Sequence, residues 1–435
     1  MVIIRLSGVG AKRRVHVALD RSPFNLPQDQ PDMPLRCGPA VLKRFAQDPP
    51  QSDVVLTVGT KLFESLERHP TVRKAVETAL AQPQGYPIYL RMDSVEAAEY
   101  PWESLFDTGR QRFLALYPET PIGRIVPAGY QVDRQYVAPP LRLVAILSAA
   151  GVDAAGEWRS LQRAVDGTSL DVEVRVVVGQ QSLHREIEAK PPAWARSVLL
   201  SRNTVISRVL QEFNPHFVHF FCHGTARPNP MLELATPRAH AAKNSDLQVA
   251  PAWLKGLAPM PLLVTLNCCS GASDAEGVRG LASELVVNAD YPAAIGMREP
   301  IEATDAHVFA ESFYGEVFSQ LEQVFTNGQP VELEWAGALC SARQALRNAH
   351  AAELPPDPAA ARHRKWTVPI LCRALAPVTL EPVEIHPSHT DDVEITAKVV
   401  QMNALARMSL GQPPAIRAAA LAGIEQIRAA LRRAA

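Results

Sequence analysis

Two short apolar runs each end in residues whose side chains can take part in nucleophilic catalysis. The first covers residues 217–225 (FVHFFCHGT) and places His223 before a glycine, and the second covers 262–272 (LLVTLNCCSGA) and contains Cys268 and Cys269. A thiol is a weak nucleophile until it loses its proton, and a histidine at hydrogen-bond distance can accept that proton. These residue types therefore predict a cysteine nucleophile with His223 as its base, provided that the two runs end side by side.

The sequence around the two runs predicts elements that would bring their ends together. From residue 141 to residue 371, short apolar stretches alternate with amphipathic helical stretches, as in a parallel sheet covered by helices on both faces. The carboxyl ends of parallel strands meet at one edge of the sheet, where the loops are free of strand pairing. We therefore expect His223 and the two cysteines to lie at that edge.

Other interpretations of the same residues are open at this point. Cysteine is among the most buried residue types, and a histidine after an apolar strand is frequently a hydrogen-bonded core group. Adjacent strand residues point to opposite faces, so only one of Cys268 and Cys269 can face the active edge, and Cys222 is expected to be buried. A zinc site made of Cys222, His223, Cys268 and Cys269 is disfavoured, because zinc ligands are usually separated by about two to four residues. We expect no metal or other cofactor.

Further motifs follow one another in a fixed order along the chain. They are 100–105 (YPWESL), 266–271 (LNCCSG), 276–282 (EGVRGLA), 294–297 (AIGM), 309–314 (FAESFY) and 366–371 (WTVPIL). Together with the His-Gly pair at 223–224 they resemble the CHAT family of the caspase and separase clan of cysteine peptidases, over roughly three quarters of the chain. The resemblance implies a caspase-like α/β fold with a mostly parallel central sheet and helices on both faces.

The resemblance also implies roles for individual residues. The family's nucleophile corresponds to Cys269 and its general base to His223, so the resemblance selects Cys269 over Cys268. Peptidases of this clan are described as using a Cys/His dyad, and the sequence names no third residue that orients His223. The backbone N–H groups of Gly224 and Cys269 are candidates for the oxyanion hole, because amides in a loop just past a strand are unpaired.

The residues around the nucleophile position depart from the family pattern and bear on substrate choice. Asn-Cys stands at 267–268 where Ser-Ala is usual, and Ser-Gly stands at 270–271 where Glu-Thr is usual. Asp274 and Glu276 follow in the same loop, where an acidic wall would favour a basic residue before the cleaved bond, as in separases and metacaspases. Two solvated loop carboxylates are an equally good interpretation. Further candidates for such a pocket lie after the next strand: Arg298 and Asp305.

The composition restricts the classes of partner and the compartment. In 435 residues, 44 Lys and Arg nearly balance 45 Asp and Glu, so no overall charge indicates nucleic acid or an anionic membrane as a partner. The six cysteines form no CxxC pair and no regular framework, which suits a reducing cytosol. No signal-peptide pattern opens the chain, and no stretch reaches the roughly 18 apolar residues of a membrane span. We expect a cytoplasmic protein without membrane contact.

The pattern predicts three parts. Residues 1–138 form an N-terminal α/β region with a hairpin and a pseudo-caspase-like subdomain, residues 139–376 form the caspase-like CHAT peptidase domain, and residues 377–435 form a C-terminal helical extension. The N-terminal aromatic segment should pack its subdomain onto the sheet through Trp102 and Leu105. Other expected elements are a strand at 54–56, a helix over 62–81 that Pro70 interrupts or restarts, a helix over 198–213 and a polar linker over 377–387. The family resemblance implies that residues 366–372 return to the sheet as a last strand.

These observations predict a cysteine endopeptidase that cleaves a protein partner through a Cys/His dyad. The family resemblance implies a regulated bacterial protease in a defence or cell-death pathway. The chain lacks the repeat array that often accompanies CHAT domains, so activation would come from its terminal segments or from an activating partner protein. The alternative is a catalytically silent CHAT-like scaffold or adaptor that acts through its terminal extensions, and the presence of both His223 and Cys269 argues against it. The sequence makes no prediction of the oligomeric state.

Overall fold

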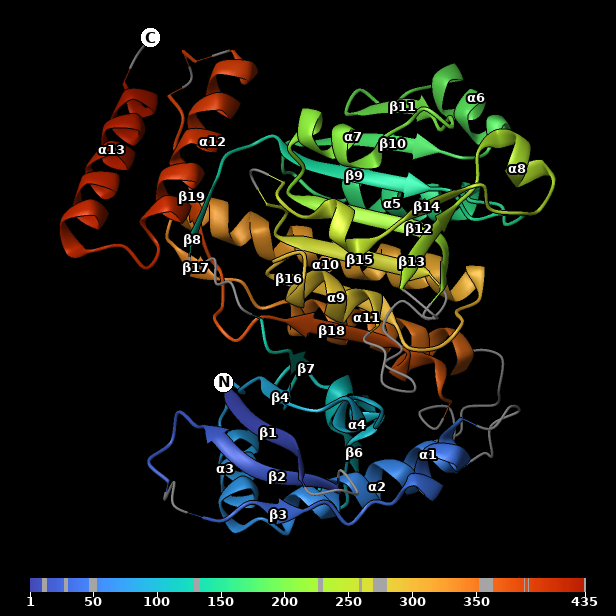
Figure 1. The fold of residues 1–435 in the computed structure, drawn as a ribbon, viewed down its shortest axis with the longest axis vertical. Coiled ribbons are helices and arrows are strands. Elements are labelled where there is room, and N and C mark those ends of the chain that lie inside the picture. The colour runs from blue at the N-terminus through green and yellow to red at the C-terminus, as the bar shows by residue number, and fades with distance from the viewer. Residues whose placement is uncertain are drawn as a thin grey trace.

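One large sheet organises the protein. The computed structural model describes residues 1–9, 14–26, 30–46, 53–128, 134–225, 230–257, 260–268, 280–351, 363–386, 388–389 and 391–433. Fourteen of the described strands belong to this sheet, which extends through the whole height of the molecule in Figure 1. In spatial order its main path is β11 (Ala195–Leu199), β10 (Val172–Val178), β9 (Leu141–Leu147), β12 (Phe217–Thr225), β15 (Leu263–Cys268), β16 (Ala293–Met297), β18 (Pro369–Arg373), β7 (Ile122–Ile125), β4 (Ile88–Met92), β1 (Val2–Val9), β2 (Arg14–Arg21) and β3 (Met33–Pro34).

The strand directions divide this sheet at β18. Along the main path, the strands from β11 to β16 run parallel to one another. Strand β18 is antiparallel to β16 but parallel to β7, and β7, β4 and β1 continue in parallel before the antiparallel β2 and β3. Two more strands extend the sheet beside β12, namely β13 (Met231–Leu234) and β14 (Leu247–Val249). The predicted mostly parallel sheet is confirmed, and so is the return of the chain to it in β18.

Helices lie on both sides of the sheet in Figure 1. The longest, α10, packs between α5 and α11, while α9 packs against β16 and β18. The helices are α1 (Pro39–Phe45), α2 (Val54–Glu67), α3 (Pro70–Leu80), α4 (Val95–Ala98), α5 (Ala155–Asp166), α6 (Gln181–Ala189), α7 (Ile206–Phe213), α8 (Pro237–Ala241), α9 (Leu281–Val287), α10 (Ala303–Asn327), α11 (Trp335–Ala351), α12 (Asp392–Ser409) and α13 (Pro414–Arg432). No helix in the described part of the chain is both long and apolar enough to cross a bilayer.

Two predicted elements are wrong. Residues 54–56, expected as a strand, form the first turn of α2, because three apolar residues fit a helical period as well as a strand period. The helix expected over 198–213 is only α7, since Val198 and Leu199 end strand β11, where pairing with β10 overrides local preference. Pro70 begins a second helix, α3, which was one of the two predicted outcomes.

The N-terminal aromatic segment packs as predicted. Trp102 is fully buried, and its indole N–H donates to the carbonyl oxygen of Ala97 at 2.7 Å. The adjacent Glu103 accepts two hydrogen bonds from the Arg124 guanidinium of β7, at 2.9 and 2.7 Å. Burial alone would raise the pKa of Glu103, but the charge and hydrogen bonds of Arg124 outweigh it and hold the pKa below its usual value. Glu103 therefore links the short helical turn that contains it, Trp102–Ser104, to strand β7 of the sheet.

The C-terminal helices form a small core of their own. Helices α12 and α13 pack together, and α12 also contacts β8 (Arg134–Val137), which pairs with β19 (Thr379–Pro382) and, through it, with β17 (Val331–Glu332). Residues 377–387, expected as a linker, thus contain a strand. Figure 1 shows α13 on the outer side of α12, away from the large sheet. The division into three domains stays a prediction.

Candidate active site

His223 lies near the end of β12 and is partly exposed. Its Nε2 forms a 3.0 Å hydrogen bond with the carbonyl oxygen of Ala150, in the loop that follows β9. A carbonyl oxygen can only accept, so Nε2 carries the hydrogen, and in the neutral ring the lone pair is on Nδ1. The sequence named no third residue to orient the imidazole of His223. In the structure, the backbone carbonyl of Ala150 orients it.

Strands β12 and β15 are parallel neighbours, as the two apolar runs predicted. Their register pairs Phe217 with Leu263 and Cys222 with Cys268. Both of these cysteines are buried, at 4% and 1% exposure, which confirms the packing role expected for Cys222. The last described residue of the second run thus lies beside the residue that precedes His223.

Several predicted site residues lie outside the described residues. These are Cys269, with its backbone amide, and the loop carboxylates Asp274 and Glu276. Their roles stay predictions. Gly224 is described, and it pairs with Leu232 of β13, so the strand continues past the point where a loop was expected.

The two further pocket candidates, Arg298 and Asp305, are engaged inside the protein. Asp305 is 3% exposed and accepts a 2.7 Å hydrogen bond from Nε2 of His350. The Arg298 guanidinium lies over the ring of Phe45, 4.6 Å from its centroid, and donates to Glu299 at 3.0 Å. These contacts give both side chains partners within the protein.

A buried polar cluster beneath the two strands was not predicted from the sequence. Oε1 of Glu157 on α5 accepts hydrogen bonds from Nε2 of His219 at 2.8 Å and from Nδ2 of Asn267 at 2.7 Å. The Asn267 amide also donates to the carbonyl oxygen of Ala306 in α10, at 3.0 Å. The available signal was a polar residue inside each apolar strand, together with the departure from the family pattern at position 267.

Aromatic and hydroxyl groups surround this cluster. The Tyr314 hydroxyl donates to Oγ1 of Thr265 at 3.1 Å, and the Tyr314 ring meets His219 edge to face. His307 packs against Phe221 with its Nε2 3.9 Å from Oε2 of Glu157, beyond hydrogen-bond range. Burial lowers the pKa of His307, and the neighbouring Glu157 opposes that shift.

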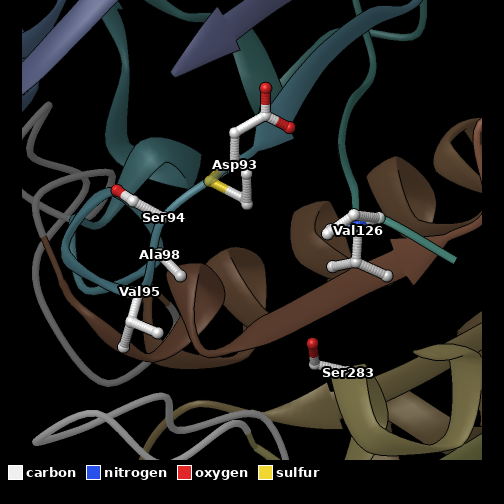
Figure 2. A pocket seen from close by; sticks show the side chains of 8 residues that line it. Asp93, Ser94, Val95, Ala98, Val126 and Ser283 are labelled. Atoms are coloured by element: carbon white, nitrogen blue, oxygen red, sulfur yellow. The ribbon is translucent and has the colours of Figure 1, made fainter. Parts of the chain in front are cut away.

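A small cavity of about 90 Å³ lies elsewhere, between the N-terminal region and α9. Figure 2 shows Asp93, Ser94 and Val95 on one side of it, with Val126 and Ser283 on the other. Of the predicted site residues that the structure describes, His223, Gly224, Arg298 and Asp305 do not line this cavity. Within the described ranges, no group of three or more His, Cys, Asp and Glu side chains is placed to hold a metal ion.

A comparison with protein-family models agrees with the family predicted from the motifs. Among solved structures, the Arg-specific cysteine proteinase gingipain R is similar, with a TM-score of 0.40 and 8% sequence identity, covering 76% of this chain and 69% of that one. No curated protein matches the chain. The CHAT domain family matches residues 57–374, well over half of the sequence. The α/β fold with a mostly parallel sheet that the resemblance implied is confirmed by the structure, and the chain belongs to the CHAT domain family.

Proposed function

We propose that the protein is a cysteine endopeptidase with Cys269 as nucleophile and His223 as general base. The observation that carries the proposal is the register of β12 and β15, which pairs Cys222 with Cys268. His223 directly follows Cys222 in the sequence, and Cys269 directly follows Cys268. Because one peptide bond spans only about 3.8 Å between Cα atoms, a thiol at position 269 starts within reach of the imidazole.

The orientation of His223 suits this role. With Nε2 donating to the Ala150 carbonyl, Nδ1 is the nitrogen that can take the thiol proton. The thiolate then attacks the substrate carbonyl carbon, and the backbone N–H groups of Gly224 and Cys269 are the proposed donors to the oxyanion. Because Gly224 pairs with Leu232, its N–H can serve only by pointing to the side of β12 opposite β13. The imidazolium returns the proton to the leaving amine as the peptide bond breaks. Water, deprotonated by the same His223, then hydrolyses the thioester and frees Cys269.

The described residues favour Cys269 over Cys268. Asn267 contacts Glu157 on the same face of the sheet as His219, and a period of two along β12 puts His223 on that face too. Cys268 follows Asn267 directly, so it belongs to the opposite face, where it is 1% exposed. A buried thiol on the far face cannot serve the imidazole of His223.

Substrate and context are proposed from the family resemblance. Asp274 and Glu276 would favour a basic residue before the cleaved bond. A partner protein would be the substrate and a second protein the activator, in a bacterial cytoplasmic defence or cell-death pathway. The alternative is the silent scaffold.

Alkylation by iodoacetamide as a function of pH, with the modified cysteine located by mass spectrometry, tests the dyad without a substrate. An unperturbed thiol titrates at about 8.5. We expect Cys269 to react at least about tenfold faster than the other cysteines at pH 6 to 7, and His223→Ala to abolish that advantage. Cys37 and Cys340 are internal references, because burial raises the pKa of each to about 11.

A Cys268→Ala variant is the matched control, and it should retain the fast reaction. If Cys269 reacts no faster than the other thiols in the wild type, the dyad is absent and the scaffold becomes the better description.

A further inference from the structure

We propose that Glu157 is a positioning residue: its carboxylate locks β12 to β15 and so sets the distance between His223 and Cys269. The inference rests on the proposed function. Glu157 belongs to neither strand, since it lies on α5. Its role follows from which residues it joins, where they lie, and how deeply the group is buried.

One carboxylate oxygen holds both strands at once. Oε1 of Glu157 accepts from His219 on β12 at 2.8 Å and from Asn267 on β15 at 2.7 Å. These two donors are not opposite each other, because the register pairs His219 with Thr265 and Phe221 with Asn267. The carboxylate therefore fixes a diagonal between the strands, and a slip of either strand along the other would break at least one bond.

The two donors share a face of the sheet with His223, and we infer the same face for Cys269 from the strand period. His219 precedes His223 by four residues and Asn267 precedes Cys269 by two, and both spacings are whole multiples of the strand period. Any change in the separation or register at Glu157 is thus passed along two or four residues of strand to the reacting groups. A misplacement of about 1 Å can cost on the order of a hundredfold in rate.

The segment that carries Glu157 also orients His223. Ala150, whose carbonyl oxygen accepts from Nε2 of His223, lies in the loop between β9 and α5, and Glu157 lies in the first turn of α5. The backbone N–H of Ser148, at the start of this loop, donates to the carbonyl oxygen of Phe221 at 2.8 Å. The segment from the end of β9 to the first turn of α5 therefore contacts β12 at two points. Ala150 orients the ring of His223, and Glu157 holds the strand through His219.

Burial makes these bonds costly to lose. Glu157 and His219 are completely buried and Asn267 is 2% exposed, so water cannot replace the carboxylate. Removing the acceptor leaves two buried donors without a partner, and strands in that state gain by moving apart. Asn267 keeps its second bond to Ala306 in α10, so the loss should loosen the strand pair locally and leave the rest of the sheet closed.

The test compares variants of the full chain by the same alkylation experiment. Glu157→Leu removes both acceptor atoms at similar volume, whereas Glu157→Gln keeps one carbonyl oxygen and is the conservative rescue. Ser160→Ala is the matched control, because Ser160 is equally buried on α5 but its hydroxyl accepts from Arg163 and is bonded to neither strand. Asn267→Ala removes one donor and serves as a milder variant should Glu157→Leu fail to fold.

We expect Glu157→Leu to lose at least about tenfold of the His223-dependent reactivity of Cys269 and to shift its pH profile toward that of an ordinary thiol. Alkylation of Cys222 and Cys268, the buried thiols of β12 and β15, should accelerate relative to Cys340, which reports global unfolding. Glu157→Gln and Ser160→Ala should stay within about threefold of wild type, and Asn267→Ala should lie between.

The two readouts separate failure of this inference from failure of the proposed function. If the wild type shows no His223-dependent reactivity at Cys269, the dyad fails, and Cys222 and Cys268 still decide whether Glu157 joins the strands. If the wild type shows it and Glu157→Leu keeps it with an unchanged pH profile, the positioning role is overturned. In that case the positioning role fails even if Cys222 and Cys268 become more reactive. A Glu157 that only holds the strands together would change the reactivity of those two thiols and leave that of Cys269 unchanged.

Discussion

Glu103 and Glu157 are both completely buried, and their hydrogen-bond partners differ: Arg124 bonds both oxygens of Glu103, whereas only Oε1 of Glu157 is bonded among the described residues. Glu103 receives a two-point hydrogen bond from the Arg124 guanidinium, while Glu157 receives an imidazole and an amide N–H. Removing a carboxylate from water costs several kcal/mol unless its lone pairs are satisfied. The guanidinium of Arg124 is itself buried, so the loss of Glu103 would remove the carboxylate that lies 2.7 Å from a buried positive charge.

Glu103→Gln should therefore destabilise the protein by about 3 to 5 kcal/mol at pH 7, measured by urea unfolding. Because the folded-state pKa of Glu103 lies below its usual value of about 4.3, its stabilisation is complete above that pH and is lost as the pH falls through the lower, folded value. The difference in unfolding free energy between wild type and Glu103→Gln should thus shrink below about pH 4.

A surface ion pair supplies the control for this measurement. Arg163 and Glu311 approach to 2.6 Å, but their side chains are 55% and 44% exposed. Solvent screens such a pair, so Glu311→Gln should cost no more than about 0.5 kcal/mol. Equal losses for Glu103→Gln and Glu311→Gln would contradict the assignment of Glu103 as the counterion of a buried charge.

At the scale of elements, helix α2 approaches the N-terminal aromatic segment without room for a side chain. A Cβ added at Gly59 would lie 1.9 Å from the carbonyl oxygen of Ser104, an impossible contact with backbone. A Cβ at Gly315 in α10 would meet nothing within 4 Å. A side chain is therefore excluded at Gly59 and has room at Gly315.

Gly59→Ala should destabilise the protein by roughly 2 kcal/mol or more, because α2 must move away from the aromatic segment. Gly315→Ala should stabilise it by up to about 1 kcal/mol, the helix-propensity difference between the two residues. Thermal unfolding of both variants measures the contrast. A neutral or stabilising Gly59→Ala would mean that α2 does not approach Ser104 this closely.

The sequence predicts elements well where one pattern extends over the whole element. The adjacency of β12 and β15 follows from continuous apolar strands that alternate with helices, and His223 follows from its type at a strand end. Glu157 could not be predicted, because its partners lie 62 and 110 residues away on two other elements. Its position on α5 shows only as a charged residue in the first turn, which helices favour for local reasons.

At the scale of the whole molecule, the N-terminal strands join the rest of the large sheet through a short contact between β18 and β7, which we call the seam. Only two residues of β18 pair with β7, Cys372 with Arg124 and Arg373 with Ile125. Arg343 of α11 reinforces the seam, since its guanidinium donates to the carbonyl oxygens of Ile122 at 3.1 Å and Pro369 at 2.9 Å. Burial lowers the pKa of Arg343 to about 10. β18 is the last strand of the large sheet in chain order, as the resemblance implied, and it lies inside the sheet with β7 on its far side.

This seam predicts how the protein responds to division at residue 138. A fragment of residues 139–435 keeps β18 but lacks β7, so β18 becomes an edge with unpaired N–H and C=O groups beside apolar surface. We expect this fragment to aggregate when produced alone and to become soluble when residues 1–138 are produced with it. Residues 1–386, which lack α12 and α13 but expose no edge of the large sheet, should stay folded with a lower melting temperature. Size-exclusion chromatography and circular dichroism distinguish these states. A monomeric, cooperatively folded fragment of residues 139–435 would instead show that the predicted boundary at 138 separates two independent domains, and that the shared sheet is an interface between them.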